Sequence, residues 1–170
     1  RYVACKPNYY IAPTNKDKHG KELWNHHKMV KRTMFNYDGV EGGKTGYTTK
    51  AGGTLVTFAK RGDQELIAVD LCAHGYELYE DTIKMLNYGF NNYKTIAPFK
   101  TMNTVLKDDT YGFLKTGNEL SPYKIPLKHL NDVTVMLEKK QSASKLTYKC
   151  KDNKYIISYD GKQIGSVKLH

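Results

Sequence analysis

The stretch GGKTGYTT brings a lysine, hydroxyl side chains and bare backbone to one point on the chain. The ammonium group of Lys44 could stabilise negative charge that develops in a reaction. The hydroxyls of Thr45 and Thr48 could donate hydrogen bonds to a carboxylate, and Gly46 would let a second backbone approach a strand edge. The same tripeptide recurs at residues 115–117. Spacing alone favours a glycine-rich turn with a solvated lysine, so the setting must decide.

The setting is predicted to be a strand hairpin followed by a helix. Residues 54–60, TLVTFAK, and 66–71, LIAVDL, are rich in β-branched and apolar residues, and RGDQ between them is typical of a turn. Their near-continuous apolar character predicts cover on both faces, and Asp70 either pairs with a lysine or lies at an exposed strand end. Residues 76–91 predict a helix from their apolar spacing and early acidic residues. Residues 8–12 predict a further short strand.

Beyond the predicted helix, short apolar stretches alternate with polar turns. The pairs Asp152-Asn153 and Asp160-Gly161 are typical of two-residue hairpin turns. This alternation of apolar stretches and turns predicts a small all-β domain over residues 95–170, after a first domain over residues 1–94. The predicted fold class is therefore α+β.

The composition constrains the partners. The net charge of +10 favours an anionic partner such as nucleic acid, an anionic membrane or an anionic cell wall. Lysines that only solvate the surface are nevertheless favoured over any one of these. Arginine, the usual reader of bases, occurs only at Arg1, Arg32 and Arg61, which argues against nucleic acid. No apolar run is long enough to span a membrane. No signal peptide is visible, and the start at Arg1 suggests a processed chain or a fragment.

The cysteines and histidines indicate no metal site or cofactor. The spacing of Cys5, Cys72 and Cys150 fits no zinc pattern, and their odd number argues against a disulfide framework. Cys72 ends an apolar run and is predicted to be a small buried thiol. His26 and His27 would point to opposite sides of a strand, so a surface pair is favoured over a metal pair.

The wider stretch DGVEGGKTGYTTKAGGTLVTFAKRGDQELIAVDL, residues 38–71, resembles the KTG region of serine D-alanyl-D-alanine carboxypeptidases, the low-molecular-mass penicillin-binding proteins. The resemblance continues upstream through YYIAPTNKDKHGKELWNHHKMV and downstream through EDTIKMLNYGF, which is similar to the helix that closes the penicillin-binding domain. It implies the C-terminal half of a penicillin-binding, β-lactamase-like domain, made of antiparallel strands and a closing helix. A small all-β domain would follow.

The family acts through S-x-x-K, S-x-N and K-T-G motifs. Its serine attacks the D-Ala-D-Ala bond of a peptidoglycan stem peptide, D-alanine leaves, and water hydrolyses the acyl-enzyme; β-lactam antibiotics acylate the same serine. By resemblance, Lys44 polarises the site and holds the substrate, Thr45 and Thr48 contact the terminal carboxylate, and Gly46 lies where the substrate backbone approaches. The implied location is outside the cytoplasm, at the cell wall or the outer face of the bacterial cytoplasmic membrane.

The nucleophile is missing from this pattern. All five serines follow the first KTG, and only residues 121–124, SPYK, and 142–145, SASK, fit S-x-x-K by letter. Pro122 biases Ser121 away from helix, SASK has the composition of a loop, and no S-x-N occurs. The chain alone is therefore predicted to be inactive. The catalytic serine and lysine would lie on a missing N-terminal half of the same enzyme, either absent or held as a second chain.

Two positions depart from the family pattern. Gly43 stands where an apolar residue often precedes KTG, and Leu78 stands where an arginine commonly helps to bind the terminal carboxylate. Carboxylate recognition would then rest on Lys44 and the threonines, or the substrate preference has changed. The alternatives are a non-catalytic module that binds peptidoglycan or a wall enzyme, and, as a third candidate, a basic nucleic-acid-binding protein.

Overall fold

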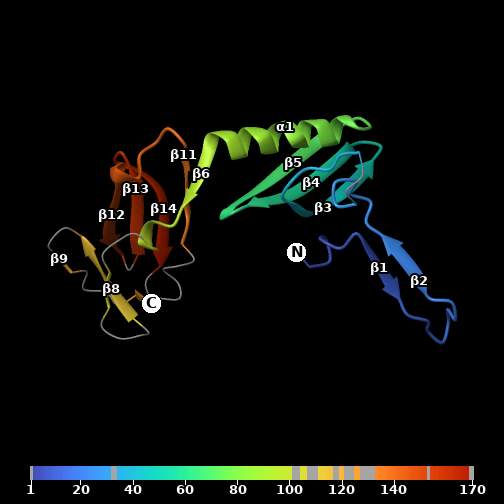
Figure 1. The fold of residues 1–170 in the computed structure, drawn as a ribbon, viewed down its shortest axis with the longest axis horizontal. Helices are drawn as coiled ribbons and strands as arrows, with labels where there is room; N and C mark the ends of the chain where they lie inside the picture. The colour runs from blue at the N-terminus through green and yellow to red at the C-terminus, as the bar shows by residue number, and fades with distance from the viewer. Residues whose placement is uncertain are drawn as a thin grey trace. The chain divides into compact units, whose positions relative to one another are not determined.

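The computed structural model describes two compact units, residues 1–92 and residues 93–170. Figure 1 shows their elements as a ribbon. The described residues are 2–31, 34–100, 104–106, 111–116, 119–120, 125–126, 133–152 and 154–168. Within them, no helix is long and apolar enough to cross a membrane.

The first unit is built on an antiparallel sheet in the order β3-β4-β5. Strand β3 spans Val40–Thr48, β4 spans Gly52–Arg61 and β5 spans Gln64–Ala73. The predicted hairpin is confirmed, with Arg61 paired to Gln64 across a two-residue turn in which Gly62 has a φ of 58°. The KTG stretch lies within β3, so it forms a strand rather than a glycine-rich turn.

Helix α1 (Glu77–Asn92) covers one face of this sheet, as Figure 1 shows. Its buried side chains are Leu78, Tyr79, Thr82, Leu86 and Phe90. They pack against the alternate residues of the strands that point the same way, among them Leu55, Ala59 and Ala68. The helical spacing predicted from the sequence is therefore confirmed, and the helix continues past Gly89 to Asn92.

The other face of the sheet is open in the described residues, so the prediction of cover on both faces is wrong for this chain. Ile67, Val69 and Leu71 of β5 are 70%, 50% and 69% exposed. Side chains alternate between the faces of a strand, so these three point away from α1, and no described element packs over them.

The segment before the sheet contains a separate hairpin. Strand β1 (Asn8–Ile11) confirms the predicted short strand, and it pairs with β2 (Lys21–Trp24), which was not predicted from the sequence. Every residue of both strands is exposed, so the KELW stretch carries no buried alternation that would signal a strand. The prediction that Cys72 is buried is also wrong. Cys72 is exposed and has a left-handed φ of 64° at the end of β5.

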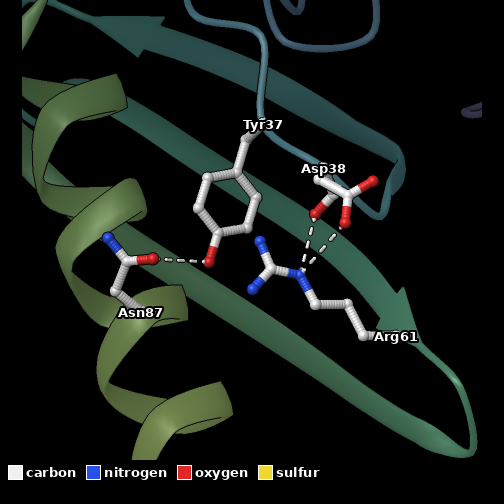
Figure 2. Close-up of polar contacts among 4 residues, drawn as sticks. All are labelled: Tyr37, Asp38, Arg61 and Asn87. Atoms are coloured by element: carbon white, nitrogen blue, oxygen red, sulfur yellow. Dashed lines mark hydrogen bonds and ion pairs between the residues drawn. The ribbon is translucent and has the colours of Figure 1, made fainter.

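A cluster of polar contacts holds the entry to β3, as Figure 2 shows. The hydroxyl of Tyr37 donates to Oδ1 of Asn87 on α1 over 2.8 Å. Nε of Arg61 donates to the carbonyl oxygen of Asp38 over 3.2 Å and lies 3.6 Å from its carboxylate. The guanidinium group also lies 4.6 Å from the ring centroids of Tyr37 and Phe90. These contacts join the turn before β3, the end of β4 and the helix.

The second unit contains β-strands and short 3₁₀ turns in its described residues. Strand β6 (Tyr93–Ile96) pairs with β11 (Val135–Glu138), and β12 (Leu146–Lys151), β13 (Lys154–Tyr159) and β14 (Lys162–Lys168) form one antiparallel sheet. A further small sheet contains β7 (Thr104–Leu106), β8 (Tyr111–Thr116), β9 (Glu119–Leu120) and β10 (Ile125–Pro126). The turns are η1 (Pro98–Lys100) and η2 (Ala143–Lys145). Antiparallel sheets with one helix confirm the α+β class.

The predicted hairpin turns lie between the strands of the three-stranded sheet. Asp160 and Gly161 have φ values of 50° and 79°, as a mirror-image turn requires, and they join β13 to β14. Lys151 pairs with Lys154, and Asp152 after Lys151 has a φ of 50°. Asn153, the second residue of the predicted turn, is outside the described residues. In the second KTG tripeptide, Lys115 and Thr116 end β8, and Gly117 is outside the described residues.

Gly39 in the turn before β3 should resist substitution. It has a φ of 88°, and an added Cβ would collide with the carbonyl oxygen of Lys60. We expect Gly39→Ala to lower the free energy of unfolding by about 3 kcal/mol, from backbone strain and the collision together. Gly62→Ala is the matched control, because Gly62 also has a positive φ but nothing within 4 Å of an added Cβ. It should cost about 1 kcal/mol. Equal losses in urea unfolding would contradict the collision.

Candidate functional site

Strand β3 presents the predicted site residues at an edge of the sheet. Within the described residues it pairs only with β4, placing Lys44 opposite Val56, Gly46 opposite Thr54 and Thr48 opposite Gly52. The alternate residue Thr45 lies opposite Leu55, whose side chain is buried beneath α1. The structure therefore brings Lys44, Gly46 and Thr48 to one face of β3 and places Thr45 on the other face.

The polar groups of this face remain accessible for chemistry. Lys44 is exposed, and its ammonium group donates to the carbonyl oxygen of Thr45 over 2.5 Å. The Thr48 hydroxyl accepts from the backbone N–H of Ala51 over 3.0 Å. A hydroxyl has one proton to donate in addition to its acceptor sites, so the Thr48 proton stays available for a carboxylate.

A buried histidine lies behind the strand. His27 is 0% exposed, and its Nε2 lies 2.8 Å from the hydroxyl oxygen of Thr57 on β4. The predicted surface pair is therefore wrong for His27, although His26 is exposed. The reason is local, because residues 25–27 belong to no strand and a turn follows at residues 28–31. Asn25 holds this turn by accepting from the His27 backbone N–H over 2.9 Å and donating to the carbonyl oxygens of Ala4 and Lys6.

The His27 ring explains the departure at Gly43. A Cβ added at Gly43 would lie 2.5 Å and 2.6 Å from Cδ2 and Nε2 of His27, and it would also collide with the carbonyl oxygen of Val56. An apolar side chain therefore cannot stand before KTG in this chain, because the histidine ring occupies its space. The burial of His27 was not predicted from the sequence, although a glycine inside a strand is itself a signal that another group approaches closely.

Burial keeps this histidine neutral. Desolvation lowers the pKa of His27 to about 4, more than its backbone hydrogen bonds raise it. The ring also meets Tyr79 of α1 edge to face, with 5.9 Å between the ring centroids. His27 therefore joins the segment before β3, the strand β4 and the helix as an uncharged packing group.

The position that resembles the family's arginine is part of the core. Leu78 is buried and packs in one cluster with Met29, Leu55 and Tyr79. Arg61 is the one arginine whose position is described, and it is held at the end of β4 by Asp38. Within the described residues, recognition of a carboxylate at this sheet therefore has no arginine available near Leu78.

Asp70 fits neither of the two environments expected for it. It lies opposite Leu55 on the side of the sheet that α1 covers, and its Oδ2 is buried without a hydrogen-bond partner in the described part of the chain. Desolvation, followed by the nearby charge of Asp81, raises the pKa of its carboxyl. Among the described residues, no cluster of histidine, cysteine and acidic side chains could hold a metal ion.

One of the two S-x-x-K matches can be inspected. Ser142 caps η2, and its hydroxyl lies 2.8 Å from that of Ser144. Lys145 donates to the Asp160 carboxylate over 3.3 Å. The lysine that would activate Ser142 is therefore engaged elsewhere. The other match, residues 121–124, is outside the described residues.

Comparisons with known proteins agree with the sequence resemblance. Residues 7–75 match the D-alanyl-D-alanine carboxypeptidase family. The chain is 30% identical over 154 residues to D-alanyl-D-alanine carboxypeptidase DacF of Bacillus subtilis, covering 88% of this chain and 37% of that protein. It is 35% identical over 77 residues to DacC of Escherichia coli, covering 45% of this chain and 18% of that protein. Penicillin binding protein 5 from Haemophilus influenzae has a similar fold, with a TM-score of 0.59 and 22% identity over 99% of this chain and 48% of that chain. The chain therefore spans less than half the length of these relatives.

The neutral His27 predicts an acid-dependent loss of stability. Its folded pKa of about 4 is below the ordinary value of 6.5, so its contribution is complete above pH 6.5 and is lost as the pH falls towards 4. The loss should be on the order of 3 kcal/mol. We expect His27→Gln to be less stable at neutral pH but to lose this pH dependence in urea unfolding. His26→Gln, at the exposed neighbour, should keep it. An unchanged pH dependence in His27→Gln would assign the acid sensitivity to other groups.

Proposed function

Because this chain resembles the C-terminal portion of low-molecular-mass penicillin-binding proteins in sequence and fold, we propose that it is part of a serine D-alanyl-D-alanine carboxypeptidase. The complete enzyme removes the terminal D-alanine from peptidoglycan stem peptides through an acyl-serine intermediate. The nucleophilic serine and its lysine lie on an upstream segment, and the reaction takes place outside the cytoplasm. β-Lactam antibiotics acylate the same serine.

The shared face of Lys44, Gly46 and Thr48 on an open strand edge is the observation that supports this function most directly. The Gly43 N–H on the outer edge of β3 donates to the carbonyl oxygen of Ala4 over 3.2 Å, and no described strand pairs with this edge beyond that point. An extended stem peptide can pair with this remaining edge through its backbone, and Gly46 leaves room for that approach. The Lys44 ammonium group stabilises the negative charge of the tetrahedral intermediate and attracts the terminal carboxylate. The Thr48 hydroxyl donates to that carboxylate. Thr45 lies on the other face, so Thr48 is the threonine that shares a face with Lys44.

The exposed face of β5 supports a partner for this chain. Ile67, Val69 and Leu71 form an apolar strip on a sheet whose two outer strands have no further partner in the described residues. Such a strip is unusual on the free surface of a protein. In this proposal, the N-terminal half of the same enzyme covers it and brings the nucleophile to β3. A dimer in which each copy places its N-terminal half on the other copy would cover the same apolar strip.

A non-catalytic module that binds peptidoglycan or a wall enzyme is the second candidate. The buried Leu78 favours it, because the chain has no guanidinium group there to clamp a carboxylate. Such a module would still use the open edge of β3 for an extended peptide, and it would bind without acylation.

Penicillin acylation of the complete protein, including the N-terminal half, tests the proposal. We expect Lys44→Ala to lower the rate of labelling by a fluorescent penicillin at least 100-fold, as the loss of a group that stabilises an oxyanion does. Lys115→Ala is the matched control, because Lys115 begins the second KTG tripeptide, and its rate should stay within about twofold of the parent.

Mass spectrometry under denaturing conditions locates the label. Label on the N-terminal half, with this chain unlabelled, supports a shared site. Label on this chain would place the nucleophile at Ser121 or Ser142 and contradict the assignment. A complete protein that takes up no label but binds a stem peptide would be the non-catalytic module.

A further inference from the structure

The outer face of the β12-β13-β14 sheet carries a row of lysines. The inner face is the core of the second unit, where Leu146, Tyr155 and Ile157 are buried. Side chains alternate along each strand, so the residues between these point outwards. Lys151 on β12 pairs with Lys154 on β13, and Lys154 pairs with Lys168 on β14. Figure 1 shows the three strands side by side.

This arrangement brings like charges together. Neighbouring strands lie about 4.8 Å apart, so the Cα atoms of these three lysines form one row across the sheet. Lys149 adds a fourth charge in the next row on the same face, opposite Ile156. All four lysines are exposed. Like charges directly opposite each other in a sheet destabilise it. The row therefore lowers the stability of the fold, and stability does not account for its presence.

No carboxylate compensates the row in the described part of the chain. Lysines elsewhere in the same unit do have acidic partners, since Lys140 lies 2.8 Å from Glu138 and Lys145 lies 3.3 Å from Asp160. Asp152 in the adjacent turn forms no such pair with the row. The remaining polar residues that share the face by register are uncharged, namely Thr147, Ser158, Gln163 and Ser166. The face is therefore a set of hydrogen-bond donors with an uncompensated positive charge.

We propose that this face, defined as Lys149, Lys151, Lys154 and Lys168 with the three hydroxyl residues, binds a linear anionic polymer of phosphodiester-linked polyols. The ammonium groups neutralise successive phosphates, and the hydroxyls donate to phosphate and polyol oxygens. Lysine binds phosphate as a point charge, so this recognition does not require the polymer to contain nucleobases or aromatic rings. The proposal concerns the second unit and does not depend on the role of Lys44.

The face fits a polymer better than a lipid surface. Peripheral membrane surfaces combine basic residues with exposed aliphatic or aromatic side chains that enter the headgroup region. Ile156, opposite Lys149, is only partly exposed, and the exposed Ile164 of β14 lies at the bulge, away from the lysine row at the other end of the strand. Binding to the polymer should therefore exceed binding to anionic vesicles at the same concentration of phosphate.

The test uses a fluorescently labelled poly(glycerol phosphate) and measures its anisotropy with the full chain at several salt concentrations. The variant Lys151→Gln, Lys154→Gln, Lys168→Gln should bind at least tenfold more weakly at low salt. The slope of log affinity against log salt should become shallower by about 2, as expected for three lost phosphate contacts. The matched control Lys16→Gln, Lys18→Gln, Lys139→Gln removes the same charge from exposed lysines outside the face. It should change the affinity less than threefold.

Two further measurements distinguish the loss of this binding site from an effect of net charge and from damage to the fold. Replacement of the same three lysines by arginine should retain binding. The glutamine variant should unfold at the same temperature as the parent or higher, because it removes like-charge repulsion. Equal losses in the glutamine variant and its matched control would overturn the site. A lower unfolding temperature in the glutamine variant, or tighter binding to phosphatidylglycerol vesicles than to the polymer, would also overturn the proposal.

Discussion

The contact between His27 and Thr57 is the constraint on which the geometry of the candidate site depends. The histidine ring is fully buried, lies 2.8 Å from the threonine hydroxyl and fills the space in front of Gly43. Burying a polar ring costs free energy unless it is hydrogen-bonded and uncharged, and in the described residues only Nε2 has a side-chain partner, because Nδ1 is buried without one. The ring, the bare backbone of Gly43 and the neutral state of His27 are therefore one arrangement.

This arrangement matters because β3 has a neighbour on one side only. A strand at the edge of a sheet has half of its backbone groups unpaired, so other contacts must fix its position. In this chain the contacts lie at three points along the strand. Arg61 and Asp38 hold its beginning, the His27 ring supports Gly43 in the middle, and Thr48 bonds to Ala51 at its end. Lys44 lies between the second and third points, on a strand whose outer edge is bonded to Ala4 at Gly43 and has no described strand partner beyond it.

Elements with a clear period could be predicted from the sequence, and groups placed by tertiary packing could not. The hairpin of β4 and β5, the helix α1 and the Asp160-Gly161 turn follow from local patterns, and all three are confirmed. The burial of His27 depends on a turn held by Asn25, which leaves no periodic signal. Continuous apolar strands predict that both faces of a sheet are covered, and this predicts burial of Ile67 and Leu71. The pattern does not say whether the covering element belongs to the same chain, and both residues are exposed here. In the candidate site, Lys44, Thr45, Gly46 and Thr48 were identified by resemblance, whereas the division of the two threonines between faces needed the register of β3.

The apolar strip on β5 has a consequence for how this chain behaves before its surface is covered. A sheet with two unpaired outer strands and a bare face of isoleucine, valine and leucine is a template onto which further strands can add. Exposed apolar surface and unpaired strand edges of this kind make a chain prone to aggregate. The net charge of +10 opposes that association through repulsion, which weakens as salt is added. Solubility of the isolated chain is therefore a balance between one strip of three side chains and the charge of the whole surface, and ionic strength sets where that balance lies.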